Sequence, residues 1–264
     1  NGKRLEIVGR GTKREFGRPS QSDMTLDMSG LSGVTLYEPA ELVLSAKAGT
    51  PIAEIEVLVA EKGQQLAFEP MDYGPLLDGP ANAGTLGGVI AANLAGSRRI
   101  KVGAARDHFL GVSAVSGRGE TFKSGGRVVK NVTGYDLCKL LAGSFGTLAA
   151  MTDVTIKTLP RPETEETVIV FGLGDARANE AMTAAMGSSC DVSGAAHLPG
   201  HLAHRFHGFE AKNAATVFRL EGVAPSVKHR KGALITLLRP FGDIAYLGEE
   251  NSRALWRSVR DASP

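Results

Sequence analysis

The sequence predicts an α+β protein made of two units, on three observations. Short strands and tight turns fill the first part of the chain, where most of the 33 glycines lie, before Gly146. Pro160 and Pro162 follow a long alternating strand and indicate a linker. From Thr167 onward, the order strand, helix, strand, strand, helix, strand is typical of a ferredoxin-like sandwich. The expected domains are residues 1–162 and residues 163–264.

Composition is that of a soluble globular protein. Of the 264 residues, 42% are hydrophobic and 22% are charged, so a packed core is expected. The net charge of +2 comes from mixed acidic and basic residues, which argues against a nucleic-acid-binding face. Cys138 and Cys190 lie far apart and are expected to be reduced thiols, so no thiolate set for zinc or an iron–sulfur cluster is expected. No apolar run is long enough to cross a membrane and no signal peptide opens the chain, so we expect a cytoplasmic protein.

The first and last residues resemble trimming boundaries. A strand is expected almost at the first residue, and a helix over 252–259 is expected to end shortly before Pro264. We therefore expect a fragment whose first domain is trimmed at the N-terminus and whose second domain is incomplete.

The stretch GPANAGTLGGVIAANLAG, from Gly79 to Gly96, consists of small residues without charge. A short helix is expected over residues 89–94, entered through Gly87 and Gly88. Glycine lets the backbone approach a ligand, and a helix start directs free amides toward negative charge. Close packing of the helix in an ordinary core explains the same composition, and the spacing alone does not decide between the two interpretations.

A second glycine-rich loop, GRGTKREFGRP, runs from Gly9 to Pro19 after a strand over residues 5–8. Thr12 and Lys13 lie between its glycines, an arrangement that favours an anion-binding nest. Arg14 stands where the dinucleotide fingerprint needs its third glycine, and no Walker sequence is present. A solvated basic turn is the alternative interpretation.

Local patterns predict the elements around these loops. Thr50 before Pro51 is typical of a helix start, with Thr50 as the N-cap. Gly143 and Gly146 are expected to interrupt the chain between a short helix and a long strand over residues 148–159.

Several charged residues lie outside the two loops. Arg98, Arg99 and Lys101 follow the glycine stretch and are expected to place positive charge beside it. Arg219 and Glu221 alternate on one expected strand, where a surface or strand-edge ion pair is the favoured interpretation.

Four histidines occur within the segment AHLPGHLAHRFHGF. They are His197, His201, His204 and His207. Their spacing is compatible with a metal site, but no carboxylate accompanies them at ligand spacing, so an exposed connection between strands is favoured. No metal site is therefore expected, and no catalytic residue can be named.

Four motifs in order carry a resemblance to a known family. They are GRGTKREFGRP, GPANAGTLGGVIAANLAGSRR, VGAARDHFLGVSAVSGRGE and VVKNVTGYDLCKLLAGSFGTLAAMTDVTIKTLPRP. Together they resemble the flavin-binding domain of the vanillyl-alcohol oxidase and p-cresol methylhydroxylase superfamily, and within it the FAD-binding E subunits of bacterial glycolate oxidases. The resemblance implies a PCMH-type FAD-binding domain of two α+β subdomains, followed by a cap domain.

The resemblance also implies a set of FAD-binding residues. The first group contacts the diphosphate, the second lines the diphosphate and flavin side, the third continues that wall, and the last closes the adenine and ribose region. In this order they are Arg10, Gly11, Thr12 and Lys13; Thr85, Gly87, Gly88 and Asn93; Gly103, Arg106 and Asp107; and Gly134, Tyr135 and Asp136.

Two departures from the family pattern refine these implications. The glycine–histidine pair that carries a covalent flavin link in many relatives is absent, so non-covalent FAD is expected. The H-G-D-G-N type metal motif of 2-hydroxy-acid-oxidising relatives is absent as well.

The resemblance implies the FAD-binding subunit of a glycolate oxidase that converts glycolate, a small 2-hydroxy acid, to glyoxylate. Its partners would be a second flavoprotein subunit and an iron–sulfur subunit, and the complex would place it at the inner face of a membrane. Two alternatives remain open. The chain could be a stand-alone FAD-dependent oxidoreductase for another alcohol, or a non-catalytic FAD-binding scaffold of the complex.

Overall fold

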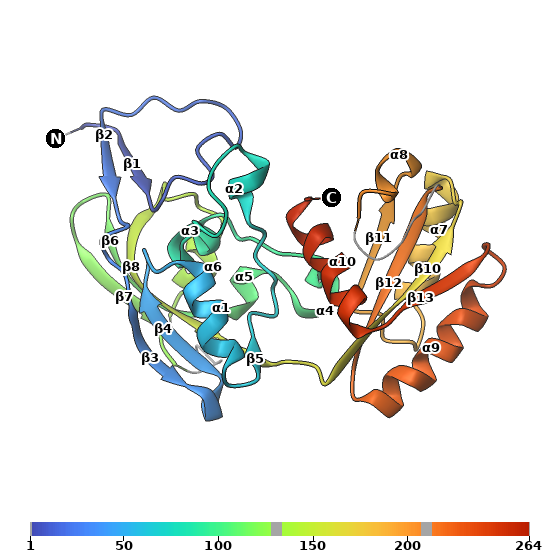
Figure 1. The fold of residues 1–264 in the computed structure, drawn as a ribbon. Helices are drawn as coiled ribbons and strands as arrows, with labels where there is room; N and C mark the ends of the chain where they lie inside the picture. Colours follow the sequence, from blue (N-terminus) through green and yellow to red (C-terminus); the bar gives the residue numbers. More distant parts are fainter. Residues whose placement is uncertain (1, 128–133, 207–212, 264) are drawn as a thin grey trace. The chain divides into compact units, whose positions relative to one another are not determined.

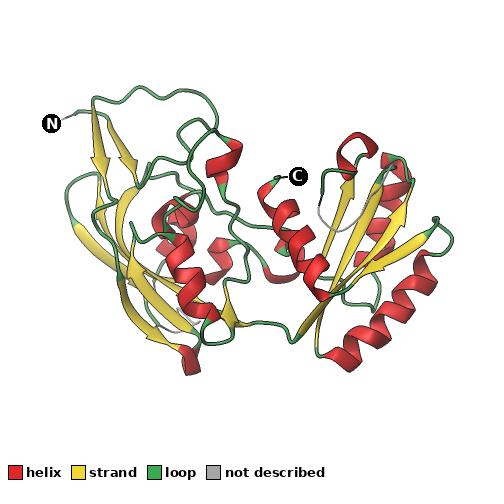
Figure 2. Ribbon diagram, in the orientation of Figure 1, coloured by secondary structure: helices red, strands yellow, loops and turns green. Residues whose placement is uncertain are grey.

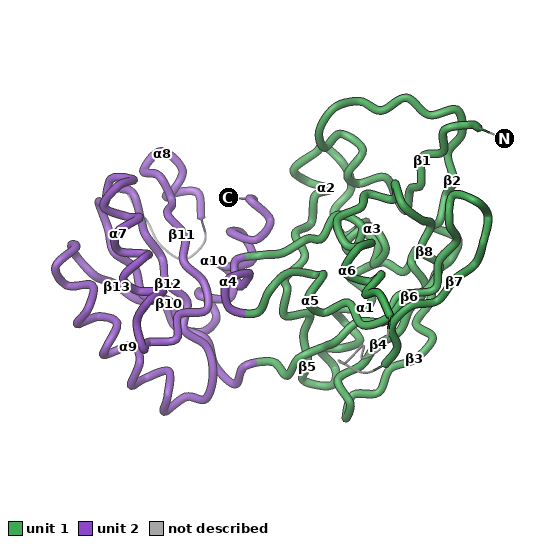
Figure 3. Tube along the Cα trace, turned by 180° about the vertical axis from the view of Figure 1, so that it is seen from behind, with its two compact units in different colours: residues 1–96, 102–161 green, residues 97–101, 162–264 purple. Residues whose placement is uncertain are grey.

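The computed structural model describes residues 2–127, 134–206 and 213–263 (Figure 1). They form two compact units, coloured separately in Figure 3. Unit 1 comprises residues 1–96 and 102–161, and unit 2 comprises residues 97–101 and 162–264. The sequence analysis divides the chain between residues 162 and 163. It does not predict that residues 97–101 belong to unit 2. No helix among the described residues is long and apolar enough to cross a membrane.

Unit 1 is built on a five-stranded antiparallel sheet with the order β3-β4-β8-β6-β7. In that order the strands are Val34–Glu38, Val43–Lys47, Ala149–Lys157, Phe109–Ser116 and Thr121–Gly125. A separate parallel pair is formed by β1 and β2, Leu5–Val8 and Met24–Asp27. A second small pair is antiparallel and consists of β5 and β9, Gln64–Gln65 and Leu159–Pro160.

Short helices accompany these sheets (Figure 2). They are η1 (Pro39–Glu41), α1 (Ile52–Ala60), α2 (Tyr73–Leu76), α3 (Leu86–Ala91), α5 (Ala105–His108) and α6 (Leu137–Leu141). Helix α4 (Arg99–Val102) lies at the boundary of the two units.

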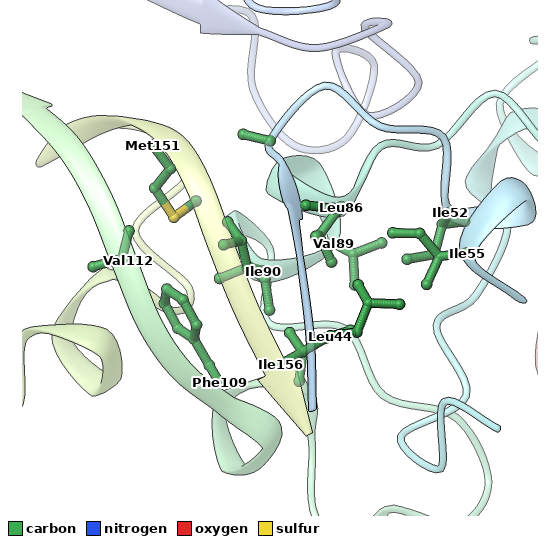
Figure 4. Close-up of a cluster of buried hydrophobic side chains, with 14 of the residues drawn as sticks. Leu44, Ile52, Ile55, Leu86, Val89, Ile90, Phe109, Val112, Met151 and Ile156 are labelled. Carbon is green, nitrogen blue, oxygen red and sulfur yellow. The ribbon is translucent and has the colours of Figure 1, made fainter. Parts of the chain in front are cut away.

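The core of unit 1 lies between the five-stranded sheet and helices α1, α3 and α6. Alternate residues of a strand point to the same face of the sheet, so one face of each strand faces the helices. Leu44 on β4 and Ile156 on β8 lie on this face and are fully buried. Helix α3 contributes Leu86, Val89 and Ile90 to the same cluster, as Figure 4 shows. Burial of side chains of this size contributes about 1.5–3 kcal/mol each to the stability of the fold.

Unit 2 is a four-stranded antiparallel sheet with the order β11-β12-β10-β13. Its elements are β10 (Thr164–Phe171), α7 (Asp175–Met186), β11 (Gly194–Leu198), α8 (Gly200–Ala203), β12 (Ala215–Gly222), α9 (Ala224–Leu238), β13 (Ile244–Leu247) and α10 (Glu249–Asp261). One apolar cluster joins the sheet to α7 and α9, and another joins it to α10 (Figure 1). The strand order and helix positions match the ferredoxin-like pattern that the sequence predicts.

The structure differs from the local predictions at several elements. Thr50 does not cap α1, because its hydroxyl donates to the carbonyl of Lys47 at 2.7 Å and accepts from the amide of Gly33 at 2.9 Å. Helix α3 starts at Leu86, three residues earlier than expected, because the Thr85 side chain caps it. The alternation of the sequence predicts a strand over residues 190–196, whereas β11 spans Gly194–Leu198.

Candidate functional site

Three turns of unit 1 surround one cavity of about 390 Å³. The first turn connects β1 to β2, the second leads into α3, and the third leads into β8. The lining residues that carry the argument are Gly9–Arg14 from the first turn, Thr85, Gly87 and Gly88 from the second, and Phe145–Thr147 from the third. The loops that the sequence singled out therefore share one hollow.

The first and second turns lie in direct contact at Gly9. A β-carbon added at Gly9 would lie 2.4 Å from the Thr85 hydroxyl oxygen, well inside van der Waals distance. Only glycine fits this approach, because the missing side chain leaves the room that Thr85 occupies.

The third turn is hydrogen-bonded to the end of α3. The amide of Phe145 donates to the carbonyl of Ala91 at 2.9 Å, and the amide of Gly143 donates to the carbonyl of Ile90 at 3.2 Å. Helix α3 thus holds both the second and third turns in place beside the first.

The first amides of α3 are already engaged inside the protein. Leu86 donates to the carbonyl of Thr50 at 2.9 Å, and Gly87 donates to the carbonyl of Ala48 at 2.7 Å. Gly88 donates to the Thr85 hydroxyl at 3.3 Å. The expectation that this helix start presents free amides to an anion is therefore wrong. The close approach of Gly87 to Ala48, 2.9 Å for an added β-carbon, shows that packing also explains this glycine.

The first turn has the open amides that α3 lacks. Within the described part of the chain, the backbone amides of Arg10, Gly11, Thr12 and Lys13 have no hydrogen-bond acceptor. The turn itself is closed by the amide of Arg14, which donates to the carbonyl of Gly11 at 3.1 Å. Consecutive open amides in a turn form an anion-binding concavity.

Positive charge dominates the lining of the cavity. Five described lining residues are cations: Arg4, Arg10, Lys13, Arg14 and Arg18. Glu6 is the one carboxylate among the described lining residues, and Arg14 holds it with two hydrogen bonds of 3.0 and 2.7 Å. The remaining net charge of the lining favours an anionic ligand.

Lys13 is the cation in the most confined position. Its ammonium lies 3.3 Å from the Thr12 hydroxyl and 5.8 Å from the centre of the Tyr73 ring. Burial lowers the pKa of Lys13 below its usual value, and the charge of Asp72 offsets part of that shift. An anion in the cavity would stabilise this ammonium and so compensate for the hydration that burial removes.

Aromatic residues border the same turn. Phe16 stacks on Phe145 with ring centres 6.3 Å apart and contacts Tyr73 edge-on at 5.7 Å. Phe145 has a φ of 50°, which is uncommon for a side chain of its size. The stacked pair joins the first and third turns at the cavity.

Seven of the fourteen residues implied by the family resemblance line this cavity. They are Arg10, Gly11, Thr12, Lys13, Thr85, Gly87 and Gly88. The other seven are not among its lining residues: Asn93, Gly103, Arg106, Asp107, Gly134, Tyr135 and Asp136.

The side chains of Asn93, Asp107 and Asp136 accept hydrogen bonds from backbone amides. The Asn93 side chain accepts from the amide of Arg106 at 2.9 Å. Asp107 accepts from the amide of Ala104 at 2.8 Å and thereby caps α5. Asp136 accepts from the amide of Lys139 at 3.1 Å and thereby caps α6.

Sequence reasoning missed the third turn as part of the site. Phe145, Gly146 and Thr147 line the cavity, although the glycines around them suggested only a break in the chain. The signal was a third glycine-rich turn, GSFGT, which lies directly before a strand, just as the first loop lies directly after one.

Two of the three cations after the glycine stretch are engaged in ion pairs that the sequence did not predict. In unit 2, Arg98 is paired with Glu221 and Lys101 is paired with Asp191. The surface ion pair expected for Arg219 and Glu221 is also wrong, because the Arg219 side chain is 1% exposed and the Glu221 side chain 8%.

The histidine segment lies in unit 2. The His197 ring bonds to Thr216 at 2.9 Å and lies 3.4 Å from Asp175. His201 lies in α8 and His204 directly follows it, both exposed, while His207 lies outside the described residues. Among the described residues, no group of three potential ligands could hold a metal ion.

The donor set of the cavity fits the diphosphate of a dinucleotide such as FAD. A diphosphate needs several hydrogen-bond donors and positive charge at one place, and the first turn supplies open amides together with Lys13. The close approach of Thr85 to Gly9 fits as well, since it brings the first and second turns together at the cavity that both of them line.

Comparisons with known proteins agree with this assignment. Residues 1–125 match the family model of an FAD binding domain. Glycolate oxidase subunit GlcE of Escherichia coli is 42% identical over 158 residues, which cover 60% of this chain and 43% of that protein. Glycolate oxidase subunit GlcD of Bacillus subtilis is 29% identical over 171 residues, 64% of this chain and 35% of that protein. D-lactate dehydrogenase of Archaeoglobus fulgidus is 34% identical over 141 residues, 50% of this chain and 32% of that protein.

The chain spans less than half the length of these three relatives. Among solved structures, alkyldihydroxyacetonephosphate synthase superposes on 98% of this chain and 50% of its own, with a TM-score of 0.74 and 18% identity. At that identity the likeness concerns the fold. Residues 1–125 therefore match an FAD binding domain, and nearly the whole chain shares its fold with alkyldihydroxyacetonephosphate synthase.

Proposed function

We propose that this chain is the FAD-binding subunit of a glycolate oxidase complex, which oxidises glycolate to glyoxylate and passes the electrons through its flavin to a partner subunit. The observation that carries the proposal is the 42% identity with glycolate oxidase subunit GlcE over 158 residues. Similarity to D-lactate dehydrogenases supports the broader class, FAD-dependent oxidation of a 2-hydroxy acid.

The residues of the cavity have a binding role in this proposal. The open amides of residues 10–13 donate to the diphosphate oxygens, and the Lys13 ammonium neutralises part of their charge. Thr85 and Gly9 fix the distance between the two turns. Bound FAD supplies the acceptor for the two electrons and the hydrogen that leave the C–H bond of the hydroxy acid. The fourteen residues implied by the family resemblance remain the proposed FAD-binding set, with the first turn at the diphosphate.

The remaining parts of the proposal concern partners and location. A second flavoprotein subunit and an iron–sulfur subunit would complete the complex, and the names of two relatives as glycolate oxidase subunits support a multi-subunit enzyme. Cys138 and Cys190 are buried free thiols, which are compatible with the reducing cytoplasm.

The test uses the chain as purified, first alone and then with its partners. FAD is added, free FAD is removed, and the absorbance near 450 nm reports bound flavin. Glycolate is then added without oxygen. If the flavin of this chain is reduced only after the partner flavoprotein and the iron–sulfur subunit are added, the result supports the subunit proposal. Reduction by glycolate in the isolated chain would exclude the scaffold alternative. A flavin that stays oxidised even in the assembled, active complex would instead support that alternative.

One prediction concerns Lys13. Lys13→Met is expected to weaken FAD binding by about 10- to 100-fold, because a charge-assisted hydrogen bond contributes about 1.5–3 kcal/mol. Lys62→Met, at an exposed position after α1, serves as the control and is expected to bind FAD like the wild type. Equal affinities of Lys13→Met and wild type would show that Lys13 does not face the diphosphate.

A second prediction concerns pH. Because burial lowers the pKa of Lys13, its ammonium is lost at a lower pH than that of an ordinary lysine. The affinity for FAD is therefore expected to fall as pH rises from 7 toward 10, with most of this pH dependence absent from Lys13→Met. Titration of flavin fluorescence at several pH values measures both curves, and parallel curves would contradict the assignment.

A further inference from the structure

Residues 97–101 belong to unit 2, although the chain on either side of them belongs to unit 1 (Figure 3). Their side chains explain this. The Ser97 hydroxyl accepts from Arg219 at 3.1 Å, Arg98 pairs with Glu221, and Lys101 pairs with Asp191. We call residues 97–101 the crossing segment.

The Arg98–Glu221 pair is the strongest of these attachments. The guanidinium engages both carboxylate oxygens, with the Arg98 Nε to Glu221 Oε2 bond at 2.9 Å and a second bond from Nη2 to Oε1. Side-chain exposure is 9% for Arg98 and 8% for Glu221. A bidentate pair this well buried is held in one geometry, and removal of one partner leaves the other charge buried without compensation.

The pair lies on a polar network beneath the crossing segment. Arg219 lies 3.4 Å from Glu221 and 4.6 Å from the centre of the Trp256 ring. Trp256 in turn donates to the Thr167 hydroxyl at 2.8 Å. The network therefore connects the crossing segment to α10 and to β10 in the centre of the unit 2 sheet.

Both flanks of the crossing segment are fixed in unit 1. The amide of Gly96 donates to the carbonyl of Phe68 at 2.8 Å, and the amide of Ala105 donates to the carbonyl of Leu94 at 2.9 Å. Helix α3 lies just before these flanks in the sequence; its residues Gly87, Gly88 and Ala91, together with Ala92 directly after it, line the FAD cavity. Only a few residues separate the cavity wall from Arg98.

We propose that Arg98 is a positioning residue that couples occupancy of the FAD cavity to the stability of unit 2. FAD binding restrains the turns around α3. The chain from α3 to Arg98 transmits that restraint, because its first residues line the cavity and Arg98 at its other end is held by Glu221. Coupling of this kind is reciprocal: whatever free energy FAD adds to the stability of unit 2, a folded unit 2 adds to the binding of FAD. The inference requires FAD binding by unit 1 but not oxidation of glycolate.

Trp256 provides the readout, because it is the only tryptophan of the chain and lies in unit 2. Urea unfolding is followed by its emission maximum, without FAD and with saturating FAD, while flavin absorbance reports binding separately. In the wild type, FAD is expected to raise the midpoint of the Trp256 transition. In Arg98→Met this rise is expected to be largely lost, and the affinity for FAD is expected to fall by the same factor, about 5-fold or more.

Three control variants separate coupling from simple destabilisation. Arg99→Met changes the exposed neighbour and is expected to keep the full rise. Leu234→Ala removes a fully buried side chain of unit 2, so it is expected to lower both midpoints and keep the rise. Arg98→Lys retains the charge without the bidentate geometry and is expected to restore part of the rise.

Several results would overturn the proposal. An Arg98→Met protein that keeps the wild-type rise, or a wild type that binds FAD without any change in the Trp256 transition, would do so. If Arg98→Met does not fold, amide exchange of residues 97–101 in the wild type decides: slower exchange with FAD supports the coupling, and unchanged exchange contradicts it. Absence of FAD binding would overturn this proposal and the FAD assignment together, whereas FAD binding without glycolate oxidation in the complex would overturn only the proposed function.

Discussion

Gly9→Ala is expected to weaken FAD binding by about 10- to 100-fold. The added β-carbon would lie 2.4 Å from the Thr85 hydroxyl, so the first turn must move away from the second. Overpacking of this kind costs about 1–3 kcal/mol. If FAD binding requires the two turns to be in contact, this cost reduces the affinity by the stated factor. Backbone strain is not the reason, since the φ of Gly9 lies outside the left-handed region.

A matched glycine variant tests the explanation. Gly30 lies in the same unit and has no atom within 4 Å of an added β-carbon, so Gly30→Ala is expected to bind FAD like the wild type. Flavin fluorescence titration measures the affinities, and circular dichroism verifies that both variants fold. A Gly9→Ala protein with wild-type affinity would show that the contact between the two turns does not shape the FAD site.

Glu221→Gln is expected to lower the free energy of unfolding by about 3 kcal/mol at pH 7. Burial alone would raise the pKa of Glu221, but the hydrogen bonds from Arg98 and the charges of Arg219 and Arg98 outweigh burial and hold it at about 2. A shift from 4.5 to about 2 corresponds to roughly this free energy, and loss of one member of a buried pair has a similar effect.

The pH dependence of this effect has a defined sign. A carboxyl group whose pKa is lowered in the folded state stabilises the fold above its unfolded pKa of 4.5, and that stabilisation is lost as pH falls toward about 2. The difference between wild type and Glu221→Gln is therefore expected to be constant from pH 7 to about 5 and to shrink below that. Urea unfolding followed by Trp256 emission between pH 3.5 and 8 measures it.

Glu165 supplies a contrasting control within the same network. Burial raises the pKa of Glu165, although the charges of Arg219 and Arg98 lower it in part. Ionisation of this group therefore destabilises the fold as pH rises, and Glu165→Gln retains an oxygen that can accept the 2.8 Å hydrogen bond from Ser252. We expect no loss of stability in Glu165→Gln at pH 8. An equal loss in both glutamine variants would contradict the distinct roles of the two carboxyl groups.

The sequence predicted much of the fold because the relevant signals are local. Strand alternation and glycine turns located many of the strands. In unit 2 the sequence pattern predicts a helix over residues 175–186 and a strand over residues 244–247, and the structure has both at those bounds. Thr50 shows the limit of such signals: a threonine before a proline is typical of a helix cap, but its hydroxyl bonds instead to a neighbouring turn and to Gly33.

By itself, the sequence determined the type of fold and the positions of two glycine loops, because composition and short motifs specify turn geometry directly, and four of its motifs resemble those of FAD-binding domains. The tertiary structure alone decided which amides remain open. The sequence left open whether the first amides of α3 are free; carbonyls of Thr50 and Ala48 occupy two of them, whereas the amides of residues 10–13 are available. It also decided that Arg98 and Arg219 are buried with Glu221 in unit 2. The physical reason is that hydrogen-bond and ion-pair partners far apart in the chain are chosen by packing, and no local pattern records that choice.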